Sequence, residues 1–147
     1  MSFKGKIQED LKVSLKAGDQ VRSLTLRMLL AAMVNKEKEG KEVTEQQLLD
    51  VVSSEVKKRR EAEEAFLKGE RPELAEKEKA ELEVLLSYLP EQLTEDQIRT
   101  FVKEAIQKTG AANIKDMGKV MGELAPNVKG KADGALVAKI VQQLLNF

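Results

Sequence analysis

Apolar residues recur three and four positions apart along most of this 147-residue chain, and no segment alternates apolar and polar residues over any length. Spacings of three and four place side chains on one face of an α-helix, whereas a half-buried strand requires strict alternation. The first stripe follows Ser2, a helix-capping residue type, and consists of Phe3, Ile7, Leu11 and Leu15. The pattern therefore predicts an all-α fold.

Capping residues and helix breakers divide the chain into seven predicted helices. These helices begin near residues 2, 19, 44, 72, 94, 114 and 133. Five of them end at a helix breaker: Gly18, Gly40, Gly69, Gly110 and Pro126. Capping boxes of the form T-x-x-Q start two of them, at Thr44 and Thr94. The second helix, with "VRSLTLRMLLAAMV", is apolar over more than half its circumference, so we expect it to be central and buried.

Pro90 marks the predicted domain boundary, because it ends one helix within "YLPEQL" and charge density falls after it. Residues 1–89 carry 17 basic and 18 acidic side chains, whereas residues 90–147 carry 8 and 7. We predict an N-terminal four-helix domain over 1–89. We predict a C-terminal three-helix domain over 90–147, with helices at about 94–109, 114–125 and 133–146.

Composition excludes several classes of site. The chain has neither cysteine nor histidine, so it forms no disulfide, no zinc site of those ligands and no histidine-based catalytic triad. Aromatic residues make up 3% of the chain, which argues against base stacking as a way to hold nucleic acid. We expect no cofactor, no metal and no membrane partner. The missing cysteines and the polar N-terminal stretch favour a cytoplasmic protein.

Two charged segments are candidate sites, but a solvated helix face accounts for the charges of each without a binding or catalytic role. The run Lys57 to Arg60 spreads around its helix and is followed by Glu61, Glu63 and Glu64, so an ion-paired solvated helix is the favoured interpretation. The next helix carries Glu76, Glu78, Glu81 and Glu83, but lysines interleave and no cation-binding loop is present. A solvated helix face is again the favoured interpretation.

The segment "MGKVMGELAPNVKGKADG" is the strongest candidate site. Gly118 and Gly122 lie one above the other on a predicted helix, where two interior glycines cost about 2 kcal/mol relative to alanine. Close helix packing and the approach of a phosphate backbone explain them about equally well. Four lysines lie near this face or in the Gly130 loop: Lys115, Lys119, Lys129 and Lys131. The loop leads into a helix that Asp133 caps, and lysines beside the amides of a helix N-terminus favour a phosphate site.

The same segment, with "YLPEQL", "LRMLLAAM" and "EVKKRREAEEAF", resembles the YqeY family over essentially the whole chain. The part after Pro90 is similar to the tail domain of GatB, the tRNA-binding subunit of glutamine-dependent aminoacyl-tRNA amidotransferases. This resemblance implies a four-helix part joined to a three-helix GatB-tail-like domain. It also implies tRNA-facing or framework positions at Lys115, Gly118, Lys119, Gly122, Lys129, Gly130, Lys131 and Ala132.

Three functions remain open from sequence. The resemblance implies a tRNA-binding accessory protein, with tRNA, a tRNA-bearing complex, an amidotransferase or an aminoacyl-tRNA synthetase as partner. A helical adaptor that docks proteins without touching RNA is the alternative. The family label of carbon–nitrogen ligase activity, with glutamine as amide donor, implies an enzyme, but no catalytic residues are visible and we expect no chemistry from this chain alone.

Overall fold

The computed structural model describes residues 1–40 and 42–146, and within them it contains only helices and connecting segments. The predicted all-α class is confirmed. Contacts divide the chain into two compact units, Met1–Leu89 and the residues from Pro90 onward, which we call unit 1 and unit 2. Among the described residues, no helix has the length and apolar character that crossing a lipid bilayer requires.

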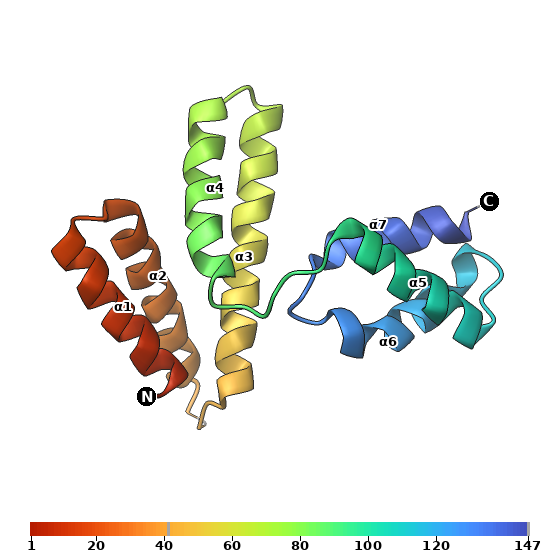
Figure 1. Ribbon diagram of the computed structural model, residues 1–147, viewed down its shortest axis with the longest axis horizontal. Helices are drawn as coiled ribbons and strands as arrows, with labels where there is room; N and C mark the ends of the chain where they lie inside the picture. The colour runs from red at the N-terminus through yellow and green to blue at the C-terminus, as the bar shows by residue number, and fades with distance from the viewer. Residues whose placement is uncertain (41, 147) are drawn as a thin grey trace. The chain divides into compact units, whose positions relative to one another are not determined.

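Unit 1 consists of two helical hairpins (Figure 1). The first pairs α1 (Phe3–Ala17) with α2 (Gln20–Glu37), and the second pairs α3 (Glu45–Lys68) with α4 (Pro72–Leu86). The two hairpins enclose a shared aliphatic core whose largest fully buried members are Ile7, Leu26, Leu29, Met33, Val52 and Leu85. Burial of these side chains, each worth about 1.5–3 kcal/mol, is the main stabilisation of unit 1.

Local signals set the helix ends of unit 1. Ser2 caps α1 by accepting a hydrogen bond from the Gly5 amide, and Thr44 with Gln47 forms a complete capping box on α3. Gly18 ends α1 with φ of 72°, a left-handed conformation that glycine adopts without a steric penalty. The tight turn this permits lets Asp19 cap α2 directly, so α1 and α2 fold back on each other.

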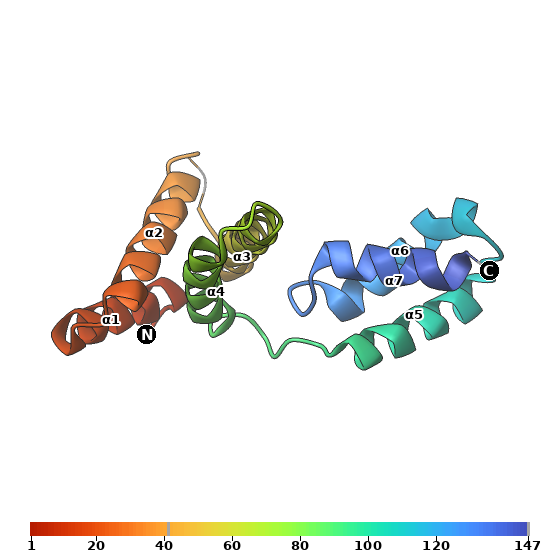
Figure 2. The same ribbon diagram turned by 90° about the horizontal axis from the view of Figure 1, so that it is seen from above.

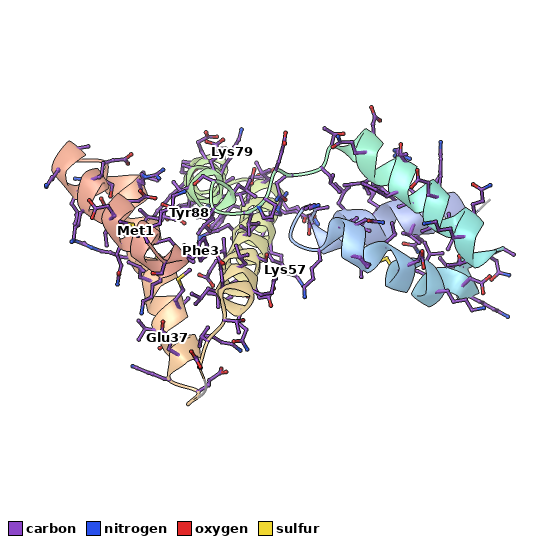
Figure 3. The ribbon with its side chains drawn as sticks, turned by 60° about the horizontal axis from the view of Figure 1, so that its bottom comes forward. Met1, Phe3, Glu37, Lys57, Lys79 and Tyr88 are labelled. Atoms are coloured by element: carbon purple, nitrogen blue, oxygen red, sulfur yellow. The ribbon has the colours of Figure 1, made fainter. Side chains whose placement is uncertain are left out.

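Tyr88 fastens the end of α4 to the first hairpin. Its hydroxyl donates to Asp10 Oδ2 at 2.6 Å, and its ring meets Phe3 edge to face with centroids 6.3 Å apart (Figure 3). Burial raises the pKa of Tyr88, and the hydrogen bond to the Asp10 carboxylate raises it further. These contacts join the residues that follow α4 to α1.

One prediction about the first hairpin is wrong, and a second is correct only in part. Leu15 does not join the core stripe and is 48% exposed, because Ser14 takes the buried position one turn before Gly18. α2 is central as predicted, since it contacts α1, α3 and α4, but it is buried on one side only. Val21 and Leu24 on its other side are each more than 40% exposed. The α3–α4 hairpin packs against one side of α2, so its remaining apolar side is left uncovered.

One member of each charged segment is buried, Arg59 of the basic run and Glu81 of the acidic helix, which the solvated-face interpretation missed. Lys57, Lys58, Glu76 and Glu83 are exposed, as that interpretation predicts. Arg59 is buried between α3 and α4, with its Nε 3.0 Å from Glu81 Oε2 and 3.6 Å from Glu78 Oε2. Its Nη2 also lies 4.0 Å from Glu55, whereas Glu61, Glu63 and Glu64 are not its partners. The ion-paired interpretation of the basic run is therefore correct for Arg59, but the partners are different and the predicted solvation of Glu81 is wrong.

The error has a simple geometric cause. Glu78 and Glu81 share a face of α4 with the core residues Leu82 and Leu85, at helical spacings of three and four. Since that face packs on α3, the two carboxylates are carried inward to meet Arg59. Burial and the neighbouring Glu81 carboxylate raise the pKa of Glu78, against the opposing effect of Arg59.

Unit 2 packs three helices and one 3-10 turn around its own core. The elements are α5 (Glu95–Thr109), η1 (Ile114–Asp116), α6 (Met117–Val128) and α7 (Gly134–Leu145), seen from a second direction in Figure 2. Fully buried side chains from all three helices make the core, among them Ile98, Val102, Val120, Leu124, Val137 and Ile140. Thr94 starts α5 with the predicted capping box.

The predicted bounds of the middle helix of unit 2 are shifted at both ends. Residues 114–116 form the 3-10 turn, so α6 begins only at Met117 and Gly118 lies in its first turn. Pro126 does not end α6 but lies inside it, with the helix continuing to Val128. Proline lacks an N–H, so the carbonyl of Gly122 loses its usual donor, yet packing of Leu124 and Val128 on the core holds the last turn in place.

Candidate nucleic-acid interface

The face of α6 that carries the two glycines is open. Gly118 and Gly122 are both exposed, and a Cβ atom built on either would meet no heavy atom within 4 Å beyond the helix backbone itself. Close packing against a neighbouring helix therefore does not explain them. The glycines form a surface without side chains on one side of α6, which we call the glycine ridge, and Ala125 extends it by one turn.

Lysines border the glycine ridge along its length. Lys115 lies in η1, Lys119 follows Gly118 directly, and Lys129 is the C-terminal cap residue of α6. All three are exposed, and a rise of 1.5 Å per residue spreads them over roughly 20 Å. A row of ammonium groups over this length suits the repeated phosphates of a nucleic-acid strand better than a single compact anion.

The lysines differ in how far acidic residues neutralise them. Lys119 Nζ lies 3.9 Å from Asp116 Oδ1, an exposed ion pair of the kind that contributes little to stability. A hydrogen bond from the Ala112 amide, joined by the Asn113 amide and the Lys119 ammonium, holds the pKa of Asp116 below its usual value. Within the described part of the chain, no carboxylate lies within 4 Å of Lys115, Lys129 or Lys131.

The loop after α6 is held by the segment that enters unit 2. Gly130 has φ of 74°, which glycine accepts readily, and its carbonyl accepts a 2.9 Å hydrogen bond from Gln92 Nε2. The Lys131 carbonyl accepts a 2.7 Å hydrogen bond from the Leu93 amide. These contacts fix the backbone beneath Lys129 and Lys131, whose side chains remain exposed and available to an anion.

The N-terminal amides of α7, predicted to bind a phosphate, already have a carboxylate partner within the protein. Asp133 Oδ1 accepts a 3.2 Å hydrogen bond from the Ala135 amide, so a carboxylate already occupies the start of this helix. A phosphate at the same amides would face that charge at short range. The lysines and the glycine ridge, not the start of α7, are therefore the parts of this site that suit a phosphate backbone.

The sequence does not predict the hollow that lies beside Lys131. It has a volume of about 290 Å³ and lies within unit 2, lined by Pro90, Glu91, Gln92, Leu93, Gln97 and Lys131. Only the folded chain brings the segment at 90–97 next to the loop at 128–132, and no spacing in the sequence announces that contact. Among the described residues, no group of three acidic side chains is placed to hold a metal ion.

Comparison with known proteins decides the family. The family model described as "Yqey-like protein" matches residues 4–145. The chain belongs to the YqeY family. The family resemblance read from the sequence is thus confirmed, since the match spans both units of this YqeY-family chain.

Curated relatives of this YqeY-family chain carry one name in several fungi. "Altered inheritance of mitochondria protein 41, mitochondrial" of Lachancea thermotolerans is 31% identical over 93% of this chain and 78% of that protein. The protein of the same name in Pyrenophora tritici-repentis is 30% identical over 95% of this chain and 79% of its own length. In Saccharomyces cerevisiae the identity is 26% over 80% of this chain and 68% of that protein.

These relatives contradict the expected cytoplasmic location, because they are named as mitochondrial proteins. The expectation rested on missing cysteines and a polar N-terminal stretch. A lack of cysteine excludes disulfides but does not distinguish one reducing compartment from another. The location drawn from the sequence is therefore wrong as a statement about this YqeY-family chain.

Proposed function

We propose that unit 2 binds tRNA, or a complex that carries tRNA, through the phosphate backbone along the glycine ridge. The observation that carries this proposal is the open space above Gly118 and Gly122. Two glycines on an exposed helix face reduce helix stability without any packing in return, and close approach of a ligand backbone gives them a purpose. Lys115, Lys129 and Lys131 supply charge that no described carboxylate neutralises.

The mode of binding follows from what surrounds the ridge. Phe101 is the one aromatic side chain in residues 90–146, and it packs against the core of unit 2, so bases have no exposed ring to stack on. Recognition then rests on phosphates and riboses. Because Pro126 leaves the Gly122 carbonyl without its usual helical donor, that oxygen is suited to accept a hydrogen bond from a ribose 2′-hydroxyl, a group that DNA lacks.

The role is accessory, in keeping with the similarity of this unit to the GatB tail. Positioning a tRNA needs only the ridge and its lysines, and we assign no bond-making or bond-breaking step to this chain. An amidotransferase or an aminoacyl-tRNA synthetase that acts on the same tRNA is the protein partner this role calls for. The competing adaptor function needs a protein partner but no contact with RNA.

A tRNA titration with lysine variants tests the proposal. We expect Lys129→Ala/Lys131→Ala to weaken binding and to lower the slope of log affinity against log salt by about one per lysine. The matched control is Lys103→Ala/Lys139→Ala, which removes two exposed lysines from α5 and α7 and leaves the ridge intact. Equal losses in both variants would refute the ridge as the RNA site, and no binding at low salt would leave the adaptor function as the better explanation.

A further inference from the structure

Unit 1 carries a contiguous apolar surface that its own core does not use. Val21, Leu24 and Met28 follow each other along α2 at spacings of three and four, and each is between 42% and 45% exposed. The sulfur of Met28 also accepts a 3.7 Å hydrogen bond from Nη2 of Arg59, so this end of the row borders α3. Leu15 of α1, which is 48% exposed, lines the same hollow as Leu24. Neighbours at these spacings touch on a helix surface, so the four side chains form one patch, which we call the outer face of α2.

The hollow gives this face a concave centre. Its volume is about 330 Å³, and Leu15, Gly18, Asp19, Gln20, Ser23, Leu24 and Arg27 line it. A Cβ atom added at Gly18 would meet nothing within 4 Å, so the turn between α1 and α2 leaves this space open. Leu15 and Leu24 are the two large apolar residues of its lining, and the other lining residues are polar, charged or glycine. Such a hollow receives a projecting side chain of a partner, whereas a membrane surface is entered by side chains that protrude.

Positive charge borders the outer face of α2. Arg27 lines the hollow, and Lys12 and Lys16 flank Leu15 on α1. In residues 1–40 and 42–146, no carboxylate lies within 4 Å of any of these three cations. Asp19 is the one acidic residue lining the hollow, and its Oδ1 already accepts a hydrogen bond from the Arg22 amide at 3.0 Å.

We propose that the outer face of α2 binds an amphipathic helix of a partner protein, with acidic residues beside its apolar stripe. The spacing along α2 suits the ridge of another helix, and the bordering cations select carboxylates. A standard interface buries roughly 800 Å² and about 20–30 residues on each partner, far more than these four side chains supply. One docked helix therefore fits better than a permanent dimer.

A second copy of this chain is also disfavoured by charge. A two-fold dimer joins the same patch of both copies, so Arg27 and the lysines of α1 would face their own equivalents. This proposal concerns unit 1 and is independent of RNA binding by unit 2, so each can fail without the other. The chemistry that recognises the partner is a row of leucine-like side chains flanked by glutamate or aspartate.

The test uses the full chain and a designed peptide. The probe is a labelled helical peptide of about 18 residues, long enough to be helical, with leucines at spacings of three and four and glutamates beside them. A matched peptide carries lysine in place of every glutamate. Binding is followed by fluorescence anisotropy for the wild type and for Leu24→Ser, Arg27→Glu and Leu67→Ser. Leu67 is the control, an exposed leucine on α3 outside this face.

We expect saturable binding of the acidic peptide, weakened at least about tenfold by Leu24→Ser and unchanged by Leu67→Ser. Arg27→Glu should shift the preference toward the lysine peptide, a result that partial unfolding does not produce. The proposal is overturned if the two peptides bind the wild type equally, if Leu24→Ser binds like the wild type, or if no binding occurs below about 1 mM peptide. The proposal is also overturned if the wild type binds no peptide but self-associates or binds anionic vesicles, and Leu24→Ser abolishes that self-association or vesicle binding.

Discussion

Gly122→Ala should stabilise unit 2 and weaken its binding to tRNA, two effects of opposite direction from one methyl group. Gly122 lies in the middle of α6, and the new Cβ would meet no neighbouring heavy atom within 4 Å. Alanine is favoured over glycine in a helix interior by about 1 kcal/mol. The same methyl group would project from the glycine ridge into the space that the RNA backbone is proposed to occupy.

The magnitudes are within reach of ordinary assays. A gain of about 1 kcal/mol raises the melting temperature of a unit of this size by roughly 4–8 °C, which calorimetry of the full chain resolves. Val120→Ala identifies which thermal unfolding transition belongs to unit 2. Val120 is fully buried, so its truncation should lower the stability of unit 2 by roughly 1–3 kcal/mol. For tRNA we expect affinity to fall about tenfold, equivalent to roughly 1.4 kcal/mol.

Gly134→Ala is the control for Gly122→Ala. Gly134 begins α7, is open to a Cβ in the same way, and lies outside the glycine ridge, so its substitution should leave tRNA affinity unchanged. Destabilisation by Gly122→Ala would refute the claim that the ridge is unpacked. Stabilisation with unchanged tRNA affinity would refute the claim that RNA needs the bare surface.

Three further predictions concern charged groups. Asp116→Asn should tighten tRNA binding severalfold in a titration, because it frees Lys119 and removes a carboxylate from the edge of the ridge. Arg59→Met should destabilise unit 1 by about 3–5 kcal/mol in chemical denaturation, because it leaves the buried Glu81 and its neighbours without a counter-ion. Burial holds the pKa of Glu78 in the folded chain above its ordinary value of 4.5, so its contribution to stability is fully present below pH 4.5 and is lost as pH rises through the folded pKa. Glu78→Gln should therefore gain stability relative to the wild type as pH rises through that window, measured by denaturation at several pH values.

Most of the fold followed from local rules. Ser2, Thr44 and Thr94 start helices through side-chain hydrogen bonds that depend only on residues three positions away. Such signals are readable because their partners are close in sequence. Gly18 and Gly110 end helices in the left-handed conformation for the same local reason.

The errors lie where partners come from distant elements. Glu81 and Leu15 follow local patterns that predict the wrong exposure. Glu81 is buried because α3 packs over it, whereas Leu15 is left 48% exposed by the described elements. Pro126 remains inside α6 because contacts of Leu124 and Val128 with the core of unit 2 override a local signal to stop. The choice between packed and open glycines was likewise beyond the sequence, since it depends on which elements approach α6.

Chemical-shift mapping tests the proposed RNA site most directly. Backbone amide signals of the full chain would be followed in two-dimensional NMR spectra as tRNA is added at low salt. We expect the largest changes at Gly118, Gly122 and residues 129–131, with little change over α3 and α4. Changes confined to unit 1, or the absence of any change at Gly118 and Gly122 when tRNA binds, would contradict it.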